Sequence, residues 1–194
     1  MCCPARGAVR LPQAIWRFEM QDVMMWSQSV LRTTPARWTA LAESVEPELM
    51  RRAPAPGEWS AVECLRHLVE TERGVFPVRV ERFLVGKDFE AFNPDAGDAL
   101  AAAAIDAGRL AEEFEQLRTA SLVLLSRLGH ADLDRTALHP ELGRVTLREL
   151  IQEWAGHDLM HTVQAERALM QPFIDGCGPW KPYFSDHVAA RQTA

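Results

Sequence analysis

Cysteine is scarce in this sequence, and the four that are present do not form a recognisable framework. None of the cysteines belongs to a CxxC pair or follows a zinc-finger spacing; they are Cys2, Cys3, Cys64 and Cys177. A disulfide scaffold and a cysteine-ligated zinc site are therefore not expected. Long apolar runs are also missing, since no stretch approaches the roughly eighteen residues of a membrane span. Charged residues interrupt the apolar residues of the N-terminus, which argues against a signal peptide. We expect a cytoplasmic protein without membrane contact.

Basic residues are outnumbered as well, which excludes a second class of partner. The chain has 21 Lys and Arg against 27 Asp and Glu, a net charge of −6, and no basic cluster. Nucleic-acid binding needs a clustered excess of positive charge, so we expect no nucleic-acid partner. With 194 residues and 47% hydrophobic content, the chain can build the core of one domain. We assign residues 1–25 to a weakly ordered leader and residues 26–194 to a single domain.

Helical periodicity predicts an all-α fold, since no segment has convincing strand alternation. The four predicted helices span residues 34–45, 60–85, 98–128 and 146–170. Thr34 is expected to cap the first helix, with Pro35 at its first position. Ser60 and Thr146 each precede a Glu by three residues, a capping box that predicts where the second and fourth helices begin. Pro77 is a candidate kink in the second helix.

The segment "EWAGHDLMH" places His157 and His161 four positions apart near the end of the chain. On a helix this spacing lets two imidazoles reach one metal ion from the same side. Both lie on the predicted bundle-facing stripe of the fourth helix, together with Leu150, Trp154 and Gln164. Buried imidazoles need partners for their nitrogens, and a shared cation satisfies both.

A catalytic metal normally has three protein ligands and one open position, so a third ligand is needed. His67 is the best candidate, because small and polar neighbours share its strip of the second helix. The alternative is a half-exposed histidine hydrogen-bonded to Glu63 or Thr71. His130, His139 and His187 are weaker candidates, two in the loop before the fourth helix and one in the tail.

Two separated motifs give the chain a resemblance to a known family. "APGEWSAVECLRHLVETE" is followed about ninety residues later by "HPELGRVTLRELIQEWAGHDLMHTVQAER". Their order resembles the DinB/YfiT-like superfamily of metal-binding four-helix bundles. The matching positions are Trp59, Ser60, His67, Leu68, His157, Asp158, His161 and Gln164. The resemblance covers roughly residues 28–185.

The resemblance implies an up-down-down-up bundle in which His67, His157 and His161 hold a divalent metal, zinc or nickel. It also implies a small-molecule substrate, because relatives transfer low-molecular-weight thiols such as bacillithiol or have been described as metal-dependent hydrolases. A homodimer is a further implied possibility. Three neutral imidazoles would leave the ion a strong Lewis acid that activates a thiol or water against a small electrophile. The competing hypothesis is a non-catalytic, metal-stabilised module that binds a small ligand or a protein.

The sequence predicts hydrogen-bond partners of the imidazoles and pocket-lining residues less precisely than it predicts the metal ligands. Glu63, Asp158 and Gln164 are candidates to hold the histidine tautomers, although Glu63 has a capping role and Asp158 is equally compatible with solvent. Glu72 and Arg79 are candidate pocket residues, and Cys64 is either a cavity thiol or a small buried hydrophobe. The short aromatic tail with Trp180, Tyr183 and Phe184 is expected to close one end of the bundle, the alternative being a dimer interface.

Overall fold

The computed structural model describes residues 20–90 and 106–189, and these build a bundle of helices with one small hairpin. The bundle contains four long elements: α1 (Met20–Ser44), the consecutive pair α3 (Ala61–Gly74) and α4 (Phe76–Leu84), α5 (Ala107–Leu125), and α6 (Leu147–Gly176). A short α2 (Pro47–Met50) follows α1. Helix α1 packs against α5 and α6, and α3 packs against the same two helices. The all-α four-helix bundle predicted from the sequence is confirmed.

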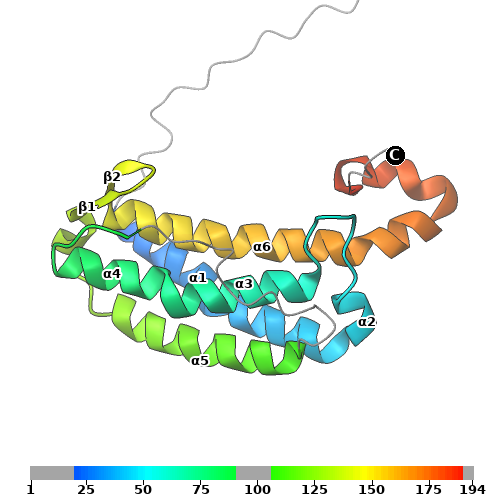
Figure 1. The fold of residues 1–194 in the computed structure, drawn as a ribbon, viewed down its shortest axis with the longest axis horizontal. Helices are drawn as coiled ribbons and strands as arrows, with labels where there is room; N and C mark the ends of the chain where they lie inside the picture. Colours follow the sequence, from blue (N-terminus) through cyan, green and yellow to red (C-terminus); the bar gives the residue numbers. More distant parts are fainter. Residues whose placement is uncertain (1–19, 91–105, 190–194) are drawn as a thin grey trace, which may run out of the picture.

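The chain direction in Figure 1 gives the up-down-down-up topology. Helix α1 runs towards α2, whereas α3 and α4 run back, and α5 begins at the same end of the bundle as α3. Helix α6 then returns in the direction of α1. Helices α3 and α5 are therefore parallel neighbours, and α6 brings its middle turns alongside α3. This arrangement puts the two histidine motifs on adjacent helices.

Two clusters of buried apolar side chains lie along the bundle. One gathers around Phe76 and Trp154, whose rings stack with centroids 5.0 Å apart. The other gathers around Trp38, Leu65 and Phe114. On α6, the first cluster ends at Ala155 and the second begins at Ala165, so His157 and His161 lie between them. Burial of apolar area on both sides holds the histidine-bearing turns in place.

Helix α1 begins earlier than predicted, and the roles assigned to Thr34 and Pro35 are wrong. The helix begins at Met20, inside the predicted leader, and Pro35 is an internal residue. Thr34 donates its hydroxyl to the carbonyl of Val30 at 2.9 Å instead of capping. Pro35 has no N–H for the carbonyl of Leu31, four residues earlier. That carbonyl accepts from Nη1 of Arg118 at 2.8 Å, which compensates for the missing helical bond.

The other helix boundaries differ from the predictions in smaller ways. The predicted second helix is broken at Val75, two residues before Pro77, with φ −119° and ψ −73°, which confirms the kink. The predicted start of the third helix, at residue 98, lies outside the described residues; α5 is described from Ala107 and ends at Leu125. Helix α6 continues through Pro172 to Gly176, six residues beyond the predicted end.

The connection before α6 contains a hairpin that the sequence prediction missed. A 3₁₀ helix at His130–Asp134 leads into β1 (Thr136–His139), which pairs antiparallel with β2 (Gly143–Thr146). Four-residue strands are too short for alternation to be visible in the sequence. The turn needs Gly143, whose φ is +78°. Thr146 ends β2 and caps α6 through the predicted capping box with Glu149.

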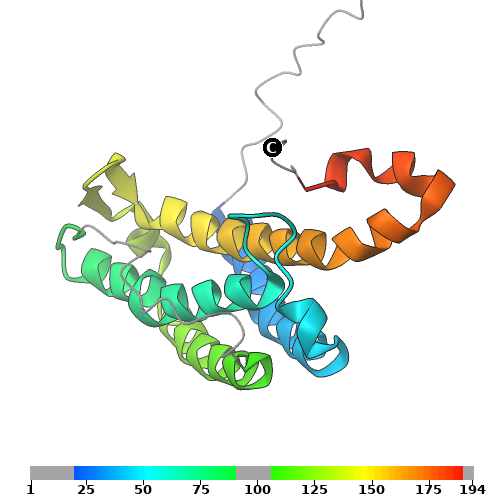
Figure 2. The same ribbon diagram turned by 45° about the vertical axis from the view of Figure 1, so that its right-hand side comes forward.

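The aromatic tail does not close the bundle, contrary to expectation. Figure 2 shows α6 carrying the chain past the bundle before the 3₁₀ helix Gly178–His187 turns back. Trp180 is 64% exposed and Tyr183 is 83% exposed. Arg167 and Gln171 of α6 hold the end of the tail through the carbonyl of His187. The dimer alternative for this tail stays a prediction. None of the described helices is both long enough and apolar enough to cross a bilayer.

Candidate metal centre

The structure brings His67, His157 and His161 together between α3 and α6. One ring nitrogen from each lies within 4.8 Å of the others, and Nε2 of His67 is 3.1 Å from Nε2 of His157. Two nitrogens bound to one tetrahedral zinc at 2.0–2.1 Å would lie roughly 3.3 Å apart. The spacing of this pair therefore fits a shared ion. No fourth His, Cys, Asp or Glu joins the group within the described ranges.

Hydrogen bonding sets the tautomer of His161. Its Nδ1 lies 2.8 Å from Oε1 of Gln164, an atom that can only accept. Nδ1 therefore donates, and Nε2 keeps the lone pair that a metal needs. The Nδ1 atom of His157 is buried and has no hydrogen-bond partner among the described residues. Within the same residues, the polar contact of that ring is made through Nε2, which lies 3.1 Å from Nε2 of His67.

Burial keeps all three imidazoles neutral. Desolvation, reinforced by His161 and His67, lowers the pKa of His157 to about 3. Desolvation and His161 lower the pKa of His67 to about 4. Burial also lowers the pKa of His161, and its bond to Gln164 opposes this change. Neutral imidazole is the ligand form of histidine, so protons compete little with a metal near neutral pH.

Two aromatic side chains wall the group. The ring of Trp59 stacks on His161 with centroids 5.7 Å apart, and its centroid lies 5.0 Å from that of His67. The ring of Phe76 meets His157 edge-on at 5.1 Å. Trp59 comes from the loop before α3, and Phe76 is the first residue of α4. The apolar walls account for the desolvation of the imidazoles and limit their rotation.

A buried ion-pair network adjoins the histidines, and the sequence analysis missed its central residue. Arg118 of α5 bonds both Glu72 and Asp158, with Nη2 2.8 Å from Oε2 of Glu72 and Nη1 2.7 Å from Oδ2 of Asp158. All three side chains are about 1% exposed. Trp154 donates to Glu72 at 3.1 Å. An arginine on the buried face of a helix was the available signal, since buried charge requires partners.

The predicted partners of the imidazoles have different outcomes. Gln164 bonds His161, as proposed. Asp158 is buried rather than solvent-facing, but its carboxylate bonds Arg118 and not an imidazole. Glu63 keeps its capping role, accepting from the backbone N–H of Ser60 at 2.8 Å and from the hydroxyl at 2.5 Å. The prediction of a histidine partner is therefore wrong for both Glu63 and Asp158.

The remaining candidates are not part of the histidine group. Burial raises the pKa of Cys64 to about 12, so it is a small buried hydrophobe rather than a cavity thiolate. His130 and His187 are exposed. His139 belongs to the hairpin, beside a hollow that Arg79 also lines. Glu72, a candidate for a pocket wall, is bonded in the Arg118 network.

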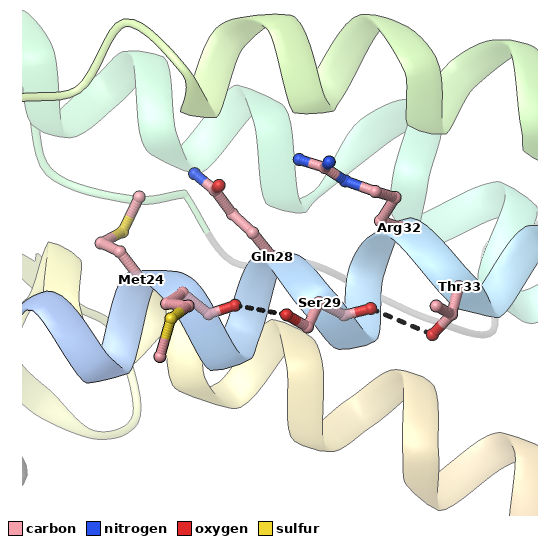
Figure 3. Close-up of a pocket in the computed structure, with 6 residues that line it drawn as sticks. Met24, Gln28, Ser29, Arg32 and Thr33 are labelled. Atoms are coloured by element: carbon pink, nitrogen blue, oxygen red, sulfur yellow. Dashed lines mark hydrogen bonds between the residues drawn. The ribbon is translucent and has the colours of Figure 1, made fainter.

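A separate hollow on α1 has no comparable chemistry. It has a volume of about 520 Å³, and its walls all come from one helix (Figure 3). The hydroxyl of Ser29 donates to the carbonyl of Met25 at 2.7 Å, and that of Thr33 donates to the carbonyl of Ser29 at 3.0 Å. These polar groups are satisfied within α1, which leaves the histidine group as the candidate functional site.

The fold and the site together define a four-helix-bundle protein with a candidate three-histidine metal centre. Residues 31–165 match the model of the DinB superfamily, and the chain belongs to this superfamily. Among solved structures, YfiT from Bacillus subtilis is similar, with a TM-score of 0.70 and 18% identity over 80% of this chain and 90% of that chain. YfiT is described as a probable metal-dependent hydrolase with an unusual four-helix bundle topology. None of the curated proteins matches the chain.

Proposed function

We propose that this protein is a metal-dependent enzyme in which His67, His157 and His161 hold a divalent ion, zinc or nickel. The convergence of three neutral imidazoles, with nitrogens within 4.8 Å of one another, carries the proposal. Imidazole suits both metals. The tautomer of His161, which leaves the lone pair on Nε2, and the 3.1 Å separation between Nε2 of His67 and Nε2 of His157 support the proposal further.

The ligand count favours catalysis over a purely structural ion. Structural zinc is usually held by four protein ligands, whereas catalytic zinc keeps one position for water or substrate. The described residues offer three ligands. An ion bound here would act as a Lewis acid and lower the pKa of a coordinated thiol or water. The three imidazoles would hold the ion, and the rings of Trp59 and Phe76 cover the histidine group from two sides.

The proposed reaction is attack by a low-molecular-weight thiol, or by water, on a small electrophilic substrate. Resemblance to the DinB-like family supports the thiol, and the description of YfiT supports water. Gln164 hydrogen-bonds His161, and its amide is neither an acid nor a base. We therefore assign nucleophile activation to the metal position and not to a protein general base.

Metal analysis followed by an activity screen tests this proposal. Purified protein should retain close to one equivalent of zinc or nickel, and added metal should raise the melting temperature. The loaded protein is then screened with bacillithiol, mycothiol, glutathione and cysteine against a generic electrophile, and with ester substrates for hydrolysis. His161→Ala should lose metal and turnover, whereas the exposed His187→Ala should keep both. Less than a tenth of an equivalent, with an unchanged melting temperature, would refute the proposal.

A further inference from the structure

A second hollow, of about 300 Å³, lies between α4, the hairpin and the first turns of α6. Its polar lining consists of Arg79, His139, Glu141, Glu149 and Glu153. Apolar side chains including Phe89 and Leu150 complete the walls, and Leu150 is only 6% exposed. The hollow therefore has an apolar floor and charged groups of both signs.

This hollow adjoins the candidate metal centre along two helices. Glu153 precedes His157 by four residues on α6, which places the two side chains on one face in adjacent turns. On α4, Arg79 follows Phe76 by three residues, and the ring of Phe76 contacts His157. One helical turn rises about 5.4 Å. The hollow and the histidine group are therefore separated by about one helical turn along each helix.

Arg79 is the strongest unmet donor of the hollow. Its guanidinium lies over the ring of Phe89, 5.2 Å from the centroid. Within residues 20–90 and 106–189 its side chain has no hydrogen bond or ion pair, and burial lowers its pKa. Arginine pairs with carboxylates in a bidentate, charge-assisted manner. A half-buried guanidinium without an acceptor is therefore suited to a carboxylate ligand.

His139 supplies a second donor. Its Nδ1 accepts from the backbone N–H groups of Glu141 at 3.2 Å and Leu142 at 3.3 Å. Burial lowers its pKa, with Arg79 contributing, so the ring is neutral at pH 7. The proton of the neutral ring must then be on Nε2, which has no acceptor among residues 20–90 and 106–189 and can donate to a ligand.

The carboxylates of the hollow supply acceptors for the opposite charge. Glu149 is occupied, since Oε2 accepts from the backbone N–H of Thr146 at 2.7 Å and from its hydroxyl at 2.8 Å. Within the described part of the chain, Glu141 and Glu153 have no side-chain hydrogen bond or ion pair, and the negative charges of both act on Arg79. An anion alone would be repelled by these carboxylates, and a cation alone by Arg79. A ligand that carries both charges meets a complement for each.

We propose that this hollow binds an α-amino-acid group of the substrate, with its carboxylate at Arg79 and His139 and its ammonium between Glu141 and Glu153. The inference rests on the proposed function, because it assigns a substrate class to the same site. The substrate is a small thiol or ester whose free amino-acid end lies several bonds from the reacting atom, as the separation of about one helical turn requires.

Titration calorimetry with three matched thiols tests the charge requirement. Glutathione carries both charges at its γ-glutamyl end, N-acetylglutathione lacks the ammonium, and an analogue with 4-aminobutyrate in place of the γ-glutamyl group lacks the carboxylate. Zinc-loaded protein should bind glutathione at least tenfold more tightly than either analogue. Arg79→Met should remove the preference for the carboxylate, and Glu153→Gln should reduce the preference for the ammonium. Arg82→Met is the control, since Arg82 pairs with Glu90 outside this hollow.

A thiol-blocked probe separates this inference from the proposed function. S-methylglutathione should bind metal-free protein and should weaken at least tenfold in Arg79→Met. The same result in a protein that fails to take up metal would support the hollow while refuting the metal enzyme. The inference is overturned if none of the probes binds, if the three thiols bind equally, or if Arg79→Met and Glu153→Gln bind glutathione as the wild type does.

Discussion

The imidazole of His161 donates from Nδ1 to the side-chain oxygen of Gln164, 2.8 Å away and three residues further along the same helix. This bond is local, because residues three apart lie on the same face of an α-helix. It leaves the lone pair of the ring on Nε2, in a histidine that is grouped with His67 and His157. A contact within one helix therefore orients a group that is shared between two helices.

Replacing Gln164 should weaken metal binding without unfolding the protein. In Gln164→Leu the His161 ring loses its acceptor, and loss of such a partner typically lowers metal affinity about 10- to 100-fold. Gln164→Glu keeps an acceptor and should retain most of the affinity. Competition with a chromogenic chelator measures the effect. Gln152→Leu, an exposed glutamine on the same helix, serves as the control, and an affinity of Gln164→Leu equal to that of this control would show that the bond has no orienting role.

Removing the guanidinium of Arg118 should strongly destabilise the fold. Arg118→Ala leaves the buried carboxylates of Glu72 and Asp158 without their counter-ion, and breaking a buried pair in this way typically costs about 3–5 kcal/mol. It also leaves the Leu31 carbonyl without the donor that replaces the missing N–H of Pro35. Urea unfolding measures the free energy. Arg109→Ala, on an exposed position of α5, should change it by about 0.5 kcal/mol or less.

A triple variant of the same network distinguishes the free-energy cost of unpaired charge from that of lost packing. If the cost of Arg118→Ala comes from unpaired carboxylates, the combined change Arg118→Met, Glu72→Leu and Asp158→Leu should restore much of the lost stability. If the triple variant is less stable than Arg118→Ala, the three side chains stabilise the fold by more than the pairing of their charges.

The helical segments and the pair His157 and His161 were predictable, because both depend on residue spacing along a single helix. His157 and His161 share a face at a separation of four residues, and Gln164 follows from the same periodicity. The family resemblance supplied His67, which residue spacing alone left undecided between a ligand and a half-exposed histidine. Topology then brings α3 beside α6.

The features that the sequence prediction missed depend on contacts between distant residues. Arg118 bonds Glu72 and Asp158 at separations of 46 and 40 residues, and its place on the buried face of α5 indicates a need for partners without identifying them. The sequence predicts a helix start at Pro35, because an internal proline leaves a helix carbonyl without its donor. The donor that satisfies this carbonyl, on Leu31, comes from Arg118, 87 residues away. Glu63 was assigned to the site although its capping bonds already use its carboxylate.

Acid should destabilise the metal-free protein through its histidines. The pKa of His157 is lowered to about 3 and that of His67 to about 4, whereas an unfolded histidine titrates near 6.5. Between about pH 4 and 6.5 the unfolded chain binds protons that the folded chain does not, so the free energy of unfolding falls as pH falls. From pH 7.5 to 5.5 we expect a loss of about 1 kcal/mol per histidine.

Urea unfolding of chelator-treated protein at the two pH values measures this loss. Burial raises the pKa of Asp158, and this shift opposes the loss of stability at lower pH. There the folded state binds a proton at Asp158 more readily than the unfolded chain does. His157→Gln should show a smaller loss than the wild type, and His187→Gln, at an exposed position, should behave as the wild type does. An undiminished loss in His157→Gln would place the pH dependence elsewhere.

Trp59 should report metal binding through its fluorescence. Its ring stacks on His161 and contacts His67, so a nickel ion held by these histidines would lie next to the indole and quench its emission. Nickel should therefore quench the wild type more than Trp59→Phe, in which the smaller ring preserves the wall and keeps metal affinity within about threefold. Trp180→Phe is the matched control, because Trp180 is 64% exposed in the tail and should contribute nothing to the change. Equal quenching in Trp59→Phe and the wild type would mean that nickel binds away from the indole, and hence away from His67 and His161.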